Sequence, residues 1–319
     1  MNATYQTLSL AEDFGHTKAG EGLLFLCGCG YESRALHLCL RLRGMRQDFD
    51  VLALGFPEYG EILCAPANRR LVRELGHEVT PTDGSVHGML SLVDTAIDRI
   101  LAKGLQCRIL VDYSSMPRRW YCNLLRRLQA APKNVHSEFW YVQGRFPGGI
   151  EYPCVGFGDF TVFSGVPRVT RTTEIHIFGL GLDSTRTYGI WNLLDPQFTC
   201  CLIAASDANT ELVQRVHKLN EEILLSANIV ENVCFGDFPR MLASIVDLAR
   251  KCVGLGDVCL VADGPKPLVL AMSVAPDIVG IPGISSWHVS HVKPDSYEPI
   301  DVAPTEHAYG FSVISSGCD

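Results

Sequence analysis

The chain has 319 residues, a formal net charge of −8, 47% hydrophobic residues and 19% charged residues. This length predicts two domains, because single cores rarely grow far beyond about 150 to 200 residues, and the composition excludes a disordered chain. The acidic balance argues against binding to bulk duplex nucleic acid or to an anionic membrane. The acidic balance does not exclude the binding of a small anionic or nucleotide ligand, since a few local basic groups suffice for that.

The first residues predict no targeting segment. Residues 1–19 lack a basic stretch followed by an apolar one, so we expect an N-terminal edge element or tail in a cytoplasmic protein. The thirteen cysteines include no CxxC pair, and we therefore expect no metal. Several of them lie in apolar runs and are predicted to fill cores, namely Cys39, Cys122, Cys252 and Cys259. The longest apolar runs are too short to cross a bilayer.

The first half of the chain alternates strand and helix patterns. Residues 23–42 predict a strand, a glycine turn and a helix, and residues 50–56 predict a second strand. A helix is expected over residues 89–101. Residues 107–128 then predict a strand that ends in Asp112, a loop containing proline and an apolar helix. A further strand is expected over residues 137–143.

The second half repeats this order, which indicates an internal duplication. The first strand, glycine turn and helix of residues 23–42 recur at residues 175–194, and the second strand of residues 50–56 recurs at 199–205. The helix of residues 89–101 recurs at 241–253, the strand, loop and helix of residues 107–128 recur at 258–275, and the strand of residues 137–143 recurs at 285–291. Both glycine turns read GxGx[ED]S, so Gly28, Gly30, Glu32 and Ser33 align with Gly179, Gly181, Asp183 and Ser184. Asp112 follows Gly28 by 84 residues, and Asp263 follows Gly179 by the same 84.

Strands separated by helices predict right-handed crossovers and a mostly parallel sheet. The expected fold class is α/β, with two tandem Rossmann-like lobes from an internal duplication, each a mostly parallel sheet flanked by helices. We place lobe 1 at residues 20–165 and lobe 2 at residues 172–319, with residues 167–173 as the linker. The segment 294–313 contains prolines and is expected to be an irregular return or an antiparallel edge strand.

The polar loops after the first and fourth strands of each half are the candidate ligand site, because ligands of parallel sheets bind beyond the carboxyl ends of the strands. Glycine turns bring backbone N–H groups close to an anion at a helix N-terminus. The alternative is structural: Ser33, Ser184, Asp112 and Ser114 also suit helix caps and turns. The predicted ligand-binding residues are Gly28, Gly30, Glu32, Ser33, Arg34, Asp112, Ser114, Ser115, Arg118, Gly179, Gly181, Asp183, Ser184, Arg186, Asp263, Gly264 and Lys266.

The NAD-binding pattern is incomplete. Ser replaces the third glycine of GxGxxG, and no clear ribose-binding acid ends the second strand, so we expect no dinucleotide cofactor, and no other cofactor is indicated.

The loop Gly264-Pro265-Lys266, which follows an acidic residue and opens a helix, resembles the signature loop of CRISPR-associated Rossmann-fold (CARF) nucleotide-sensing domains. The resemblance implies a cyclic oligonucleotide bound in a cleft between paired lobes. This chain departs from the family in two places: Pro265 replaces the family's threonine, and the first half has Ser115-Met116-Pro117 with no lysine.

The leading hypothesis is a sensor or subunit of an antiviral defence or signalling system, with a nucleotide or phosphate ligand and an effector activity carried by a protein partner. A homodimer is compatible with it. The second hypothesis is a hydrolase or transferase that acts on a nucleotide-like substrate, with Asp112 or Asp263 as the general base. The third is a scaffold subunit without catalysis, whose loops serve packing alone.

Overall fold

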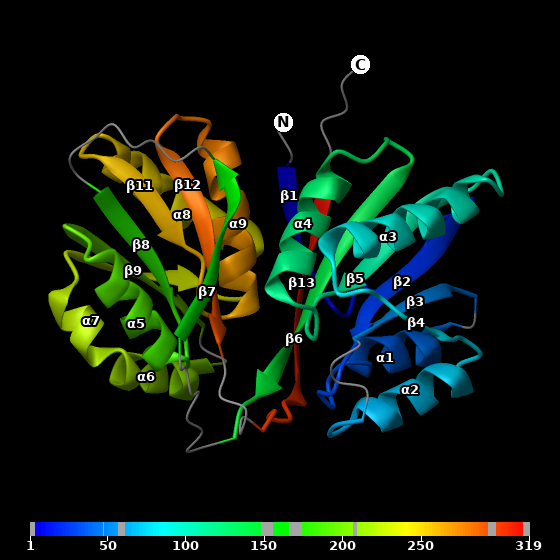
Figure 1. The fold of residues 1–319 in the computed structure, drawn as a ribbon. Helices are drawn as coiled ribbons and strands as arrows, with labels where there is room; N and C mark the ends of the chain where they lie inside the picture. The colour runs from blue at the N-terminus through cyan, green and yellow to red at the C-terminus, as the bar shows by residue number, and fades with distance from the viewer. Residues whose placement is uncertain are drawn as a thin grey trace. The chain divides into compact units, whose positions relative to one another are not determined.

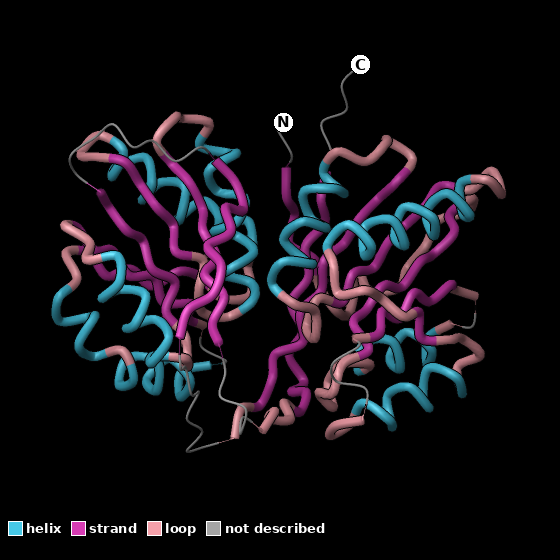
Figure 2. Tube along the Cα trace, in the orientation of Figure 1, coloured by secondary structure: helices cyan, strands magenta, loops and turns pink. Residues whose placement is uncertain are grey.

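The computed structural model describes residues 4–46, 48–56, 61–147, 156–165, 174–206, 209–292 and 298–314. The chain divides into two compact units (Figure 1). Unit 1 contains residues 1–148 and 298–319, and unit 2 contains residues 149–297. Each unit has strands at its centre and helices outside them, as the magenta and cyan segments of Figure 2 show. The predicted linker, residues 167–173, lies outside the described residues.

Unit 1 is built on a seven-stranded sheet with the order β1-β13-β6-β5-β2-β3-β4. Strands β2 to β6 run parallel to one another, whereas β13 is antiparallel to both β1 and β6. The elements are β1 (Thr4–Leu8), β2 (Glu21–Cys29), α1 (His37–Met45), β3 (Asp50–Gly55), α2 (Ala65–Glu74), β4 (Val79–Thr80), α3 (Val86–Leu101), β5 (Gln106–Asp112), α4 (Arg118–Gln129), β6 (Val135–Arg145) and β13 (Ala303–Ile314).

Unit 2 is built on a six-stranded sheet with the order β10-β9-β8-β11-β12-β7, in which only β7 is antiparallel to its neighbour. The elements are β7 (Gly156–Gly165), β8 (Glu174–Leu180), α5 (Ser184–Leu194), β9 (Phe198–Ala205), α6 (Thr210–Leu219), α7 (Glu221–Ser226), β10 (Ile229–Cys234), α8 (Phe238–Val253), β11 (Asp257–Val261), α9 (Lys266–Val279) and β12 (Ile284–Val292).

The five parallel strands of each sheet follow the same order. In unit 1 the chain runs from β2 outward through β3 to β4, returns to β5 beside β2, and continues to β6. Unit 2 follows the same course through β8, β9, β10, β11 and β12. This is the order of a Rossmann-type sheet, in which the direction of winding reverses beside the first strand. The predicted fold class, two α/β Rossmann-like lobes with mostly parallel sheets, is confirmed.

The final strand of each half belongs to the sheet of the other unit. Strand β7 comes from the first half of the repeat but pairs with β12, and β13 comes from the second half but pairs with β6. The predicted boundaries at residues 165 and 319 therefore need correction. The physical reason is that the last parallel strand of each sheet, β6 or β12, has a free edge that accepts an antiparallel strand. The strand that pairs there comes from the other half of the repeat, β13 on β6 and β7 on β12. Strand β13 is also not an edge strand, because β1 covers its far side.

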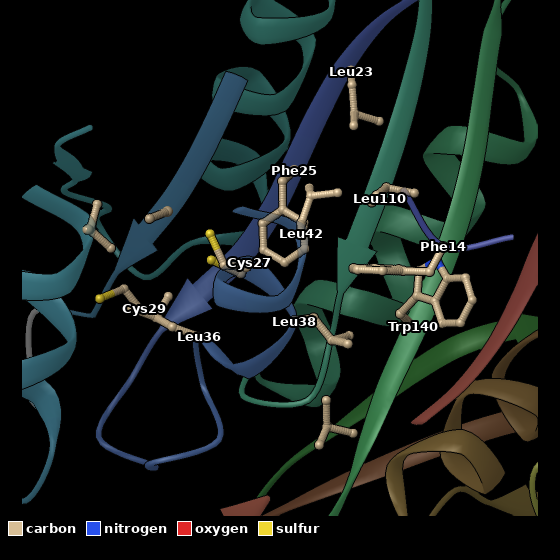
Figure 3. Close-up of a cluster of buried hydrophobic side chains, with 14 residues drawn as sticks. Phe14, Leu23, Phe25, Cys27, Cys29, Leu36, Leu38, Leu42, Leu110 and Trp140 are labelled. Carbon is tan, nitrogen blue, oxygen red and sulfur yellow. The ribbon is translucent and has the colours of Figure 1, made fainter. Parts of the chain in front are cut away.

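The core of unit 1 lies between its sheet and the helices α1 and α2. Alternate residues of β2, namely Leu23, Phe25 and Cys27, point to this side and pack on Leu38 and Leu42 of α1 (Figure 3). The period of two in the strand places its other side chains on the opposite face, which α3 and α4 cover (Figure 1). The loop residue Phe14 extends the cluster, with its ring edge-on to Trp140 at 5.1 Å between ring centroids.

The core of unit 2 repeats this arrangement. Phe178 and Leu180 of β8 pack with Ile190 of α5, Val216 of α6 and Ile223 of α7. The four cysteines that the apolar runs assign to cores, Cys39, Cys122, Cys252 and Cys259, are all buried, which confirms that prediction. Within the described parts of the chain, no helix is both long enough and apolar enough to span a bilayer.

Candidate functional site

The two polar loops of each unit follow neighbouring parallel strands. The first loop of unit 1 follows β2 and the second follows β5, and these strands pair in parallel up to Cys27 and Asp112. In unit 2 the loops follow β8 and β11, which pair up to Phe178 and Val261. These pairs flank the point where the winding of each sheet reverses, which is the end of the sheet at which parallel α/β folds bind ligands.

The glycines of unit 2 let the two loops touch through their backbones. A Cβ atom on Gly181 would lie 2.8 Å from the Cα of Gly264, and one on Gly179 would lie 2.4 Å from the carbonyl oxygen of Asp263. Gly264 itself has a φ of +86°, which side chains rarely allow. This loop contact therefore requires glycine at all three positions.

The glycines of unit 1 contact an aromatic ring instead. A Cβ on Gly28 would lie 3.0 Å from the ring of Phe56 and 3.3 Å from the carbonyl oxygen of Ser115. The Phe56 ring stacks on Trp120 of α4 at 5.0 Å between centroids. Gly28 thus serves the packing of its loop between Phe56 and the second loop.

In unit 1 the Arg34 side chain is buried in an internal network. Its exposed fraction is 2%, its Nε donates to Glu32 at 2.8 Å, and one terminal nitrogen donates to the carbonyl oxygen of Val142 at 3.1 Å. The same Glu32 carboxylate accepts a hydrogen bond of 3.0 Å from the Ser115 hydroxyl. Glu32 and Arg34 therefore join the first loop to the second loop and to β6.

In unit 2 the equivalent network uses another partner. Arg186 has an exposed fraction of 3%, and its guanidinium lies 3.0 Å from the Asp263 carboxylate. That carboxylate also accepts hydrogen bonds from the Thr187 hydroxyl at 3.1 Å and from the Gly264 N–H at 2.9 Å. The ion pair joins helix α5 to the second loop.

The two arginines are thus placed differently from what the sequence analysis expects. Arg34 and Arg186 are predicted to supplement the binding of an anion, but each is buried in an ion pair with a carboxylate of its own unit. The reason is that each loop pair encloses a carboxylate, which is tolerated in the interior only when it is paired. Their geometry is that of residues that hold loops together.

Asp112 and Asp263 do not occupy equivalent positions, although both follow their glycine by 84 residues. Asp112 is the last residue of β5 and pairs with Cys27, whereas the residue opposite Phe178 in unit 2 is Val261. Asp263 lies two residues after Val261 and therefore beyond the end of β11. Both carboxylates are buried, and Asp112 accepts a hydrogen bond of 3.0 Å from the Ser114 N–H, as a turn-forming aspartate does. The Ser114 hydroxyl in turn accepts the N–H of Val142 at 2.8 Å.

The helix starts also differ between the units. Asp183 caps α5 by accepting the N–H of Arg186 at 3.2 Å, and Ser184 is the first residue of that helix. In unit 1 the N-cap of α1 is Leu36, so Ser33 does not cap it. The Ser33 N–H donates instead to the Asp301 carboxylate at 2.7 Å. The second loops are alike in one respect, since Arg118 and Lys266 are the first residues of α4 and α9 and both are half-buried.

A buried asparagine in each unit was missed by the sequence analysis. The Asn68 amide donates to the carbonyl oxygens of Gly30 and Glu32 at 2.8 and 3.0 Å. The Asn220 amide donates to the carbonyl oxygen of Gly181 at 2.9 Å. Gly30 and Gly181 are equivalent in the repeat, so the same contact fixes the first loop of both units. The signal was present, since the asparagines follow these glycines by 38 and 39 residues.

We expect Asn68→Ala to lower the free energy of unfolding by about 1–3 kcal/mol, because it leaves two carbonyl oxygens of the first loop without their donor. Asn220→Ala should have a similar effect in unit 2. Urea denaturation measures both. Asn123→Ala is the matched control, since the Asn123 amide donates to the Arg119 carbonyl in a solvent-exposed bond. Equal effects of all three substitutions would contradict the role given to Asn68 and Asn220.

The fold and the loops define the class of this protein: two Rossmann-like α/β units of one strand order. No protein-family model and no curated protein matches the chain. A solved structure of an N-terminal ketoreductase from a macrolactin assembly line is similar to this chain, with 11% sequence identity and a TM-score of 0.23. The alignment covers 89% of this chain and 72% of the ketoreductase chain. A likeness at that level carries no argument about function.

Proposed function

We propose that the chain binds a nucleotide or another phosphate-containing ligand, as a sensor or subunit of a defence or signalling system. The observation that carries the proposal is the geometry of the second loop of unit 2. It lies at the carboxyl end of β11, beside the first loop, and ends in Lys266 at the first position of a 14-residue helix. A lysine at a helix N-terminus suits a phosphate, because both its charge and the helix dipole favour an anion.

Two further features support this loop over the first loop of unit 2. The N-cap of α9 is Pro265, whose side chain makes no capping hydrogen bond, whereas α5 is capped by a carboxylate. Lys266 is half-buried, and the glycine contact between Gly181 and Gly264 brings both loops to its side. The resemblance of Gly264-Pro265-Lys266 to the signature loop of the CARF domains points in the same direction.

The geometry gives less support to catalysis by the two candidate bases. Asp263 is held by a guanidinium, a hydroxyl and a backbone N–H, and it thereby anchors the loops to one another. Asp112 is buried and accepts the N–H of Ser114. Both roles are structural, so we keep ligand binding as the proposal.

Isothermal titration calorimetry with inorganic phosphate, ATP, GTP and a cyclic oligonucleotide tests the proposal. We expect Lys266→Ala to weaken the binding of the phosphate-containing ligand at least tenfold, about 1.4 kcal/mol. Lys251→Ala is the matched control, because Lys251 is an exposed lysine on α8 of the same unit. The assignment fails if the two substitutions weaken binding equally, or if neither has an effect.

A further inference from the structure

The first loop of unit 1 holds a carboxylate from a distant part of the chain. Asp301 lies 268 residues after Ser33, in the segment that leads into β13, and its Oδ1 accepts the Ser33 N–H at 2.7 Å. The Ser33 hydroxyl donates to the next carbonyl oxygen, that of Val302, at 3.4 Å. The other Asp301 oxygen lies 3.9 Å from the Cys64 sulfur. The contact forms because β13 enters the sheet of unit 1 beside β6.

A backbone N–H of the loop after the first strand is the donor that a phosphate oxygen would use in a fold of this type. A carboxylate on that donor makes the charge-assisted hydrogen bond that the phosphate would otherwise make. The two loops and the segment of Asp301 carry the acidic residues Glu32, Asp112 and Asp301 and the basic residues Arg34 and Arg118, and Arg34 is paired with Glu32.

The loops of unit 2 also carry acidic and basic residues. Their acidic residues are Asp183 and Asp263, and their basic residues are Arg186 and Lys266. Asp183 is used as a helix cap and Asp263 is paired with Arg186. Each second loop thus opens its helix with a basic residue, Arg118 in unit 1 and Lys266 in unit 2, and among the described residues it is the first loop of unit 1 that the Asp301 carboxylate bonds.

We infer that Asp301 takes the place of a ligand anion in the first loop of unit 1, and that the chain therefore binds phosphate groups through unit 2 alone. The inference rests on the proposed function and specifies which unit performs it. Asp301 is then a residue that determines specificity: it excludes anions from one of two loops of common origin.

The experiment titrates ATP into the full chain and four variants and measures stoichiometry and affinity by calorimetry. Asp301→Asn removes the charge and keeps the shape of the side chain, and Asp301→Ala also vacates its position. The third variant combines Asp301→Asn with Lys266→Ala. Glu306→Gln is the matched control, because it removes an exposed carboxylate from β13 itself. Urea denaturation verifies that each variant is folded.

We expect one ATP per wild-type chain and per Glu306→Gln chain. Both Asp301 variants should bind a second ATP, so that the stoichiometry rises from one to two, with Asp301→Ala the stronger binder. The combined variant should bind one ATP, through unit 1. If the wild-type chain binds ATP through Lys266 but neither Asp301 variant gains a second site, the inference is overturned and the proposed function stands. Two equivalents bound to the wild-type chain also overturn it, and no ATP binding in any protein overturns both.

Discussion

Residues 1–165, the lobe that the repeat delimits, will not fold cooperatively on their own. Residues 1–148 joined to residues 298–319 by a glycine–serine linker will do so. Only the second polypeptide contains β13, which pairs with β6 on one side and with β1 on the other. Without it, β1 has no neighbour in the sheet and the free edge of β6 is exposed, an arrangement that favours aggregation.

The packing explains the size of this effect. The Phe311 ring of β13 stacks on Phe139 at 5.4 Å between centroids, and a Cβ atom on Gly310 would lie 2.5 Å from the ring of Trp140. Each large apolar side chain that becomes exposed to solvent lowers the free energy of unfolding by about 1.5–3 kcal/mol. The free energy of unfolding of a whole domain is only about 5–15 kcal/mol. Losing β13 therefore removes a large share of the stability of unit 1.

Circular dichroism during urea denaturation distinguishes the two polypeptides. The joined polypeptide should show one sigmoidal transition, and residues 1–165 should show a gradual change or precipitate. If residues 1–165 unfold in a transition with the same midpoint as the joined polypeptide, β13 is dispensable and the division into units described above is wrong.

The substitution Arg186→Met should lower the free energy of unfolding by about 3–5 kcal/mol. It removes the cation of a buried ion pair and leaves the Asp263 carboxylate uncompensated in the interior. Combining it with Asp263→Asn should reduce the loss, because the charge is then absent while the amide oxygen still accepts the Gly264 N–H. The pair therefore should not behave additively.

Urea denaturation of the two single variants and the double variant completes this test as a double-mutant cycle. Arg250→Met is the control, since Arg250 forms an exposed ion pair with Asp247 on α8 and such pairs contribute about 1 kcal/mol or less. A loss for Arg186→Met no larger than that of the control would show that the Arg186–Asp263 pair does not hold the loops of unit 2.

The repeat was sufficient to predict the α/β class and the parallel core of both sheets, because strand and helix patterns are local and recur in the same order. It could not predict the exchange of β7 and β13. Both return strands are long and antiparallel to the strand that they pair with, so their local patterns do not tell which sheet each of them joins. The choice is a pairing between segments far apart in the sequence, which no local pattern encodes.

The site was predicted at the level of loops and less well at the level of residues. The loops converge within each unit, as the glycine pattern indicates. The ion pairs could not be predicted, because Arg34 pairs with Glu32 in its own loop whereas Arg186 pairs with Asp263 of the second loop. The equal spacing of Asp112 and Asp263 was misleading, since the strand registers differ between the units.

The exchanged strands also set an order of events during synthesis. All residues of unit 2 lie between the two parts of unit 1, so a ribosome completes the second unit while the first still lacks a strand. Nascent chains fold as their segments emerge, at about 5–20 residues per second. The N-terminal unit therefore completes its sheet last. The edge of β6 stays exposed while about 150 residues of unit 2 are synthesised, until β13 is made and pairs with it.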